Sequence, residues 1–306
     1  MILMTSRISF YDQISRNKFK SVLLMGIVFL VLVTLGYVIG IVMGPDYFMI
    51  IMIFAVIISL AYILISYYNS DKIALASVNA KPASGAKYSQ FNHVVEGLCL
   101  ASGMPKPKLY VMEDSNINAF ASGRDPKHAV ICITTGALNK LDKQELEGVI
   151  GHELSHIANY DIRFMTLVAV LVGMIAIISQ IFIRSLFWRN LRGGGRDKNQ
   201  TQIIFIIVGI VMAILAPITV TLVQLSISRK REFTADASAV KFIRSPTGLI
   251  KALKKIASEY PSIESKKKYN KAIAPLFISD PFKKKIKGLW ATHPSIKKRI
   301  NILERM

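Results

Sequence analysis

GHELSH, residues 151–156, is the most informative stretch of this 306-residue sequence. It contains the pattern HExxH, in which His152 and His156 stand four residues apart. On a helix, side chains four residues apart share one face, with Cβ atoms about 5–6 Å from each other. Two imidazoles placed in this way can both reach one Zn²⁺ at roughly 2.0–2.1 Å.

Glu153 directly follows the first histidine, so its carboxylate can reach a water on the metal without binding the metal itself. Zinc lowers the pKa of such a water towards about 7, and a neighbouring carboxylate can then take its proton. The resulting hydroxide attacks a peptide carbonyl. The pattern therefore predicts a zinc-dependent peptidase with Glu153 as its base. The alternative is a surface helix that carries two histidines by chance.

The residues before HExxH predict the helix that the chemistry needs. Asp142 followed by Glu145 is an acidic variant of the capping box, which marks a helix start. Apolar residues then recur at helical spacing and should form the buried face: Leu146, Val149, Ile150 and Ile157. The metal-binding pattern thus lies on a capped, partly buried helix.

A small β-sheet is expected before this helix. Lys108 to Met112 and Ala129 to Thr134 have the composition of short strands. Asn118-Ala119-Phe120-Ala121 is a candidate third strand, at an edge of the sheet. Residues 69–163, which carry ten basic and ten acidic residues, should form one compact unit.

Long uncharged stretches indicate a membrane protein. Hydrophobic residues make up 52% of the chain, and the mean hydropathy is +0.41. Four runs carry no charge: Ser21 to Pro45, Tyr47 to Ser70, Phe164 to Ile183 and Asn199 to Ser228. A helix needs roughly 20 apolar residues to cross a bilayer. Buried core helices usually carry a polar face, and the first run is too long for a cleaved signal peptide.

We therefore expect an α+β protein, mainly helical, with four apolar spans and a zinc protease domain that carries a small β-sheet. The expected units are a hairpin at 1–68 turning at Gly44-Pro45-Asp46, the protease region at 69–163, a second hairpin at 164–228, and a basic region at 229–306. Basic residues before the first run place the N-terminus in the cytoplasm. The loop Arg184–Lys198 carries a net +4, which conflicts with simple alternation. The third and fourth runs could span fully or could form a hairpin that packs against the enzyme without crossing.

A zinc protease needs a third protein ligand. Glu232 is the best candidate, and Asp236, one helical turn later, could accept a hydrogen bond from a ligating imidazole. Taken alone this pair is a weak signal, because acidic residues after a basic juxtamembrane segment are common.

These motifs together resemble the HtpX family of membrane zinc metallopeptidases, relatives of the CAAX prenyl endopeptidases. The resemblance is carried by HELSH with Ile157-Ala158-Asn159-Tyr160-Asp161, by Arg231–Asp236, by Asn118–Gly123 and by Thr292-His293-Pro294-Ser295. It covers nearly the whole chain in order. Tyr160 departs from the usual pattern, where a small or basic residue stands.

The resemblance implies a gluzincin-type site, with His152, His156 and Glu232 on one Zn²⁺ per chain and Glu153 as base. It also implies a multi-pass protein of the plasma membrane whose active site faces the cytoplasm. The implied role is quality control, in which damaged or unfolded membrane proteins are cleaved.

Two further roles follow from the family motifs. Substrates are expected to bind as extended strands along Asn118, Ala119, Phe120 and Ala121. His293 is a candidate for polarising the scissile carbonyl, although a lone histidine before proline is often structural. Arg299 is the alternative donor, or it could hold its segment against the protease domain.

The charge and the cysteine content of the chain limit the partners and sites that can be expected. Residues 229–306 hold 20 Lys and Arg against 6 Asp and Glu, a net +14, which suggests attraction to anionic lipid. No nucleic-acid recognition motif accompanies this charge, so no nucleic acid is expected as a partner. Cys99 and Cys132 form no CxxC pattern and should be reduced core residues.

Three rival functions are less consistent with the sequence. An intramembrane metalloprotease would carry HExxH inside an apolar run, but charged residues precede it here. An inactive scaffold would be expected to lose a ligand or the base. A prenyl-protein endopeptidase is the closest alternative, and relatives of that type carry more spans than the four runs found here.

Overall fold

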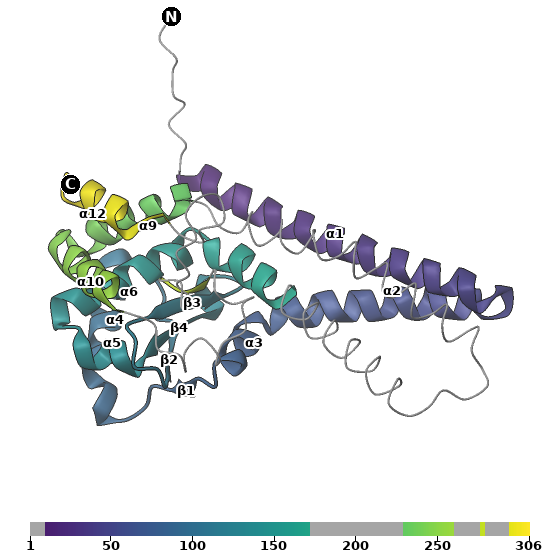
Figure 1. The fold of residues 1–306 in the computed structure, drawn as a ribbon, viewed down its shortest axis with the longest axis horizontal. Helices are drawn as coiled ribbons and strands as arrows, with labels where there is room; N and C mark the ends of the chain where they lie inside the picture. Colours follow the sequence, from purple (N-terminus) through teal and green to yellow (C-terminus); the bar gives the residue numbers. More distant parts are fainter. Residues whose placement is uncertain (1–9, 172–228, 260–275, 279–293) are drawn as a thin grey trace, which may run out of the picture.

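The computed structural model describes residues 10–171, 229–259, 276–278 and 294–306. Two long helices lie side by side and extend from a body built of a small sheet and shorter helices (Figure 1). The sheet and the helix that carries HExxH both belong to this body.

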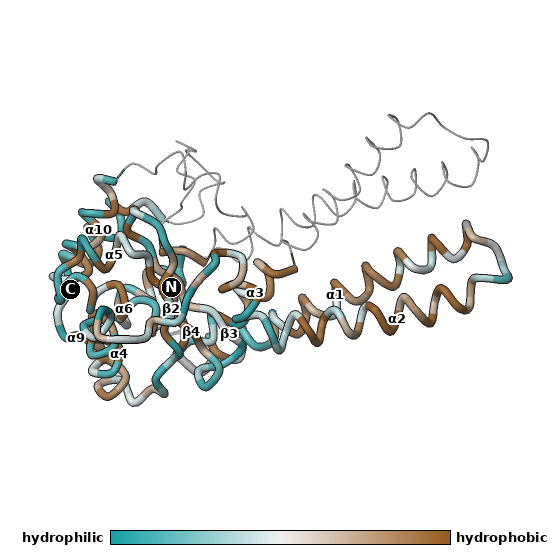
Figure 2. Tube along the Cα trace, turned by 90° about the horizontal axis from the view of Figure 1, so that it is seen from below, coloured by the Kyte–Doolittle hydropathy of each residue, from teal (hydrophilic) through white to brown (hydrophobic). Residues whose placement is uncertain are grey.

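The two long helices form the predicted N-terminal hairpin. Helix α1 spans Phe10–Met43 and α2 spans Pro45–Tyr68. The chain therefore turns at Gly44, the first residue of the predicted turn, whereas Pro45 and Asp46 already belong to α2. At 1.5 Å per residue, the 34 and 24 residues extend about 51 and about 36 Å. Both are long and apolar enough to cross a bilayer, and Figure 2 shows that hydrophobic residues predominate along both. Leu30 and Ile58 are examples of large side chains that are more than 60% exposed.

Two glycines one turn apart allow the hairpin helices to approach closely. A Cβ added to Gly36 would lie 2.2 Å from the Cβ of Ala55, and one added to Gly40 would lie 2.9 Å from the Phe48 ring. Small residues spaced in this way are typical of contacts between membrane helices, where backbones pack directly.

Within the described residues, the sheet has four strands in the order β1-β2-β4-β3. Strands β2, Lys108–Met112, and β4, Ala129–Thr134, are parallel and have the predicted bounds. Strand β3, Ala119–Gly123, is antiparallel to β4, with Ala121 opposite Ile131. It lies at an edge of the sheet, as predicted. The short edge strand β1, Lys81–Pro82, was not predicted.

Helices surround the sheet (Figure 1). They are α3 at Ser70–Ser77, α4 at Ser89–Ser102, α5 at Thr135–Lys140, α6 at Lys143–Ala158, α9 at Arg229–Ile243, α10 at Thr247–Ser258 and α12 at Ile296–Leu303, with single 3-10 turns at Ala86–Tyr88 and Pro126–His128. The sequence did not predict α3, α4 or α5 individually. The basic region beyond residue 229 is helical at α9, α10 and α12.

Helix α6 is the centre of the body. The predicted capping box is confirmed: Glu145 N–H donates to Asp142 Oδ1, and Asp142 N–H donates to Glu145 Oε2, each at 2.8 Å. The four predicted apolar residues, Leu146, Val149, Ile150 and Ile157, are all at most 2% exposed. Helix α10 crosses α6 so closely that a Cβ on Gly248 would lie 2.1 Å from the Gln144 carbonyl oxygen. HExxH is therefore held inside the core.

Two smaller predictions also concern the core. Cys99 and Cys132 are both free and buried, as expected. The third apolar run begins as a helix, and its residues Phe164, Leu167, Val168 and Leu171 pack against α1 at Leu24 and Val28. The rest of that run, the fourth run and the loop Arg184–Lys198 lie outside the described residues.

Candidate metal centre

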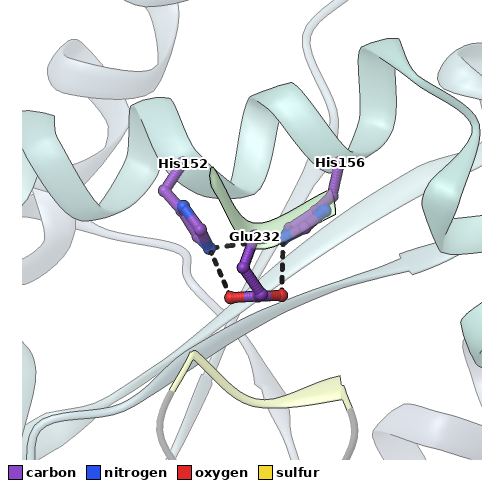
Figure 3. A group of neighbouring side chains, drawn as sticks. All are labelled: His152, His156 and Glu232. Atoms are coloured by element: carbon purple, nitrogen blue, oxygen red, sulfur yellow. Dashed lines mark hydrogen bonds and ion pairs between the residues drawn. The ribbon is translucent and has the colours of Figure 1, made fainter. Parts of the chain in front are cut away.

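Three buried side chains from two helices meet at one point (Figure 3). Helix α6 places the Nε2 atoms of His152 and His156 3.2 Å apart. Helix α9 brings the carboxylate of Glu232 against both rings. Its oxygens lie 3.6 Å from His152 Nε2 and 3.7 Å from His156 Nε2. The sequence predicted this set, although Glu232 stands 76 residues after His156.

The donor set fits a zinc ion. Two imidazole nitrogens and one carboxylate form a common ligand set for catalytic zinc. In a tetrahedral site with donors at roughly 2.0–2.1 Å, the donors lie about 3.3 Å from one another. The three atoms here lie within 4.8 Å of each other, and all three residues are at most 5% exposed. Small adjustments would bring them to coordination distance.

Each imidazole is oriented by a carboxylate on its other nitrogen. His152 Nδ1 lies 3.0 Å from Asp236 Oδ1, and His156 Nδ1 lies 3.0 Å from Asp161 Oδ2. A hydrogen bond at Nδ1 fixes the tautomer and leaves Nε2 as the ligand atom. Asp236 occupies its predicted place. The role of Asp161 was missed, although the residue lies in the quoted segment after HELSH.

The two histidines differ in their pKa. Burial lowers the pKa of His152 to about 4, helped by the charge of Arg299, and Asp236 only partly opposes this. Burial acts in the same direction on His156. There the hydrogen bond to Asp161 and the charge of Glu232 outweigh burial and raise the pKa to about 9. The carboxylates of Asp161 and Glu232 therefore stabilise positive charge on the His156 ring.

Glu153 lies beside this cluster and is 1% exposed. Burial raises its pKa to about 7. The neighbouring His156 and a hydrogen bond from the Ala121 backbone oppose the shift, while Glu232 adds to it. A carboxyl group with a pKa near neutrality is well suited to exchange protons at physiological pH. The contact with Ala121 also brings strand β3 directly against the predicted base.

Arg299 on α12 is buried behind the cluster. Its Nε and Nη2 donate to Asp236 Oδ2 and Oδ1 at 2.8 and 2.6 Å, and its Nη1 lies 3.5 Å from Glu232 Oε2. Burial alone would raise the pKa of Asp236, but the charge of Arg299 and the His152 hydrogen bond lower it. Of its two predicted roles, Arg299 fits the one that holds its segment against the protease domain.

The residues predicted to bind substrate lie in or directly before strand β3. Ala119, Phe120 and Ala121 lie on β3, and Asn118 precedes it; all four are buried. On the outer edge of β3, Ala119 O accepts a hydrogen bond from Ile278 N–H at 3.0 Å. The rings of Phe277 and Phe120 pack together with their centroids 5.4 Å apart. His293 lies outside the described residues.

Comparisons with known proteins agree with this geometry. Residues 86–306 match the profile of Peptidase family M48. A protease HtpX homolog of Caldanaerobacter subterraneus subsp. tengcongensis is 45% identical over 83% of this chain and 84% of its own. Homologs of the same name from Dictyoglomus thermophilum and Listeria monocytogenes are 40% and 39% identical, each over 97% of this chain and 95% and 99% of their own.

Among solved structures, S. mikatae Ste24p matches with a TM-score of 0.47 and 18% identity, over 96% of this chain and 67% of that one. The sequence matches extend over most of the chain and include α6 and α9, which carry the two histidines and the glutamate of the cluster. The chain therefore belongs to peptidase family M48, and it is a membrane metallopeptidase.

Proposed function

We propose that the protein is a zinc endopeptidase in which His152, His156 and Glu232 hold one zinc ion per chain. The observation that carries this is the buried triangle of two Nε2 atoms and a carboxylate, with each Nδ1 already held by an aspartate. When bound, zinc supplies Lewis acidity, which lowers the pKa of a water and polarises the scissile carbonyl.

Glu153 is the proposed general base. Its carboxylate takes the proton of the attacking water and then delivers it to the nitrogen of the leaving amine. Asp236 and Asp161 hold the two imidazoles so that both Nε2 atoms face the same point. His293 is proposed to donate a hydrogen bond to the oxygen on which negative charge develops.

The proposed substrates are unfolded or damaged membrane proteins, bound as an extended strand along β3 at Asn118 to Ala121. This is supported by the position of β3 at the sheet edge and by the Ala121 contact to Glu153. It is also supported by the outer edge itself, where Ala119 O accepts a backbone N–H from a short apolar segment, Leu276–Ile278. An outward-facing carbonyl of an edge strand can also accept a backbone N–H from a bound peptide.

The proposed location is the plasma membrane, with four spans and the active site on the cytoplasmic side. Arg16, Lys18 and Lys20 directly precede the apolar part of α1, which favours a cytoplasmic start. The basic region 229–306 would attract anionic lipid, and we propose no nucleic-acid partner. In this arrangement the zinc site lies close to the bilayer, where a membrane-bound substrate can reach it.

Metal analysis tests the proposal. Purified parent protein should contain one zinc per chain and cleave an unfolded membrane protein until a zinc chelator is added. His152→Ala and Glu232→Ala should lose the metal and the activity together. His128→Ala is the matched control, because this exposed histidine pairs with Asp125 away from the site. Unchanged zinc content in His152→Ala would refute the assignment.

A further inference from the structure

Asn17 on α1 is a buried polar residue that contacts the protease body far away in the sequence. It is 5% exposed. Its Nδ2 donates to Asn159 O at 3.0 Å and to Asp161 Oδ1 at 2.7 Å. Asn159 is the C-cap of α6, so one amide group contacts the end of the HExxH helix and the loop that follows it.

The contact continues to the metal centre. Asp161 uses one carboxylate oxygen for Asn17 and the other for His156 Nδ1, at 3.0 Å. A carboxylate held at both oxygens cannot rotate freely, so the hydrogen bond from Asn17 fixes the direction in which Asp161 accepts from the imidazole. Three residues thus form a continuous chain from the first apolar helix to a proposed zinc ligand.

Two basic side chains lie near Asp161 and the loop that contains it. Arg231 Nε lies 3.9 Å from the same Asp161 oxygen that accepts from Asn17. Arg231 could draw the carboxylate towards itself if Asn17 were absent. Lys18 is the next residue on α1, and its Nζ lies 4.6 Å from the centroid of the Tyr160 ring in the same loop. This cation–π contact also holds the loop against α1. An amide orients Asp161 without neutralising its charge.

We propose that Asn17 is a positioning residue for the metal centre, acting through Asp161 to aim His156 Nε2, so that the membrane hairpin completes the site. The inference rests on the proposed zinc function. Partners behind metal ligands typically change metal affinity by 10–100-fold when they are removed. Asn17 is one step further from the metal than Asp161, so we expect a loss of about tenfold.

The test uses the full chain in detergent and measures zinc affinity by competition with a chelating dye. Asn17→Leu keeps the size of the side chain but removes both hydrogen bonds, and should weaken zinc binding about tenfold. Ser21→Ala is the matched control. Ser21 lies one turn further on the same buried face and donates only to Asn17 O within its own helix. Removal of the Ser21 hydroxyl in Ser21→Ala should leave zinc affinity unchanged.

A double-mutant cycle separates positioning from simple helix packing. If Asn17 acts through Asp161, the loss caused by Asn17→Leu should disappear when Asp161→Asn is already present. Equal losses in both backgrounds, or parental zinc affinity in Asn17→Leu, would overturn the inference. Where Asn17→Leu does not accumulate, Asn17→Ser takes its place in the cycle. Failure of the parent to bind zinc would instead refute the proposed function.

Discussion

The two histidines of α6 show how neighbours give identical side chains different properties. His152 faces Asp236, whose charge is already shared with Arg299, whereas the partner of His156, Asp161, accepts from the neutral Asn17. Burial lowers the pKa of both imidazoles. The charge of Arg299 lowers the pKa of His152 further, whereas Asp161 and Glu232 raise that of His156. Outer partners therefore set the character of each proposed ligand.

Glu153→Gln tests the base at the residue scale. The amide keeps the size of the side chain and does not disturb the proposed ligands, so zinc content should stay at the parental level. It cannot take a proton from water, so kcat should fall by about 10²–10⁴-fold. Turnover of an unfolded substrate and metal analysis of the same preparation provide the measurement. Activity close to that of the parent would mean that another group is the base.

His293→Ala tests the proposed donor to the scissile carbonyl. Loss of one such donor typically lowers kcat by about 10²–10³-fold. Zinc content and melting temperature should stay close to the parental values, because neither depends on a contact made only in the transition state. A parallel fall in activity and melting temperature would assign His293 a structural role. Glu153→Gln, measured beside it, shows the effect of removing the chemistry alone.

At the scale of elements, the hairpin depends on direct backbone packing. Gly36→Val should destabilise it by about 1–3 kcal/mol, because the added atoms overlap Ala55 on α2. Gly26→Val is the control, since a Cβ there meets nothing within 4 Å. Thermal unfolding in detergent measures both variants. Equal melting temperatures for the two would show that the crossing at Gly36 can relax.

Local sequence signals determined which elements could be predicted. Strands β2 and β4 have the predicted bounds because each is a short apolar run, and α6 begins where its capping box indicates. Strand β1 has only two residues and carries no periodicity that could reveal it.

The contacts that tie elements together were harder to predict. Asn17 reaches Asp161 across 144 residues, and nothing around Asn17 in the sequence marks it as a partner of the site. Arg299 appeared in the sequence as a candidate donor, but its place against Asp236 depends on how α12 packs on α9. Such polar contacts exist only in the folded chain, so composition and spacing do not reveal them.

At the scale of the whole molecule, the apolar hairpin and the protease body are not separate parts. Leu24 and Val28 of α1 pack on the helix that follows HExxH, and Asn17 contacts the end of α6. A body cut from its hairpin would expose this apolar surface to water. The same apolar helix therefore contacts both the helix that follows HExxH and the C-cap of α6.

The hydrogen bond from Ile278 to Ala119 has a further consequence for kinetics. If substrates bind along this edge of β3, they compete with a segment of the same chain, which is present at a fixed and high effective concentration. The apparent KM then equals the intrinsic dissociation constant divided by the fraction of molecules in which this edge of β3 is free.

Ile278→Pro removes the competing N–H and should lower KM at unchanged kcat. Ile278→Val keeps the N–H and should leave KM unchanged. An unchanged KM in a folded Ile278→Pro variant would contradict this. A substrate must therefore bind tightly enough to displace Leu276–Ile278. A long, unfolded apolar segment can do so, whereas the weak contacts of a folded protein cannot.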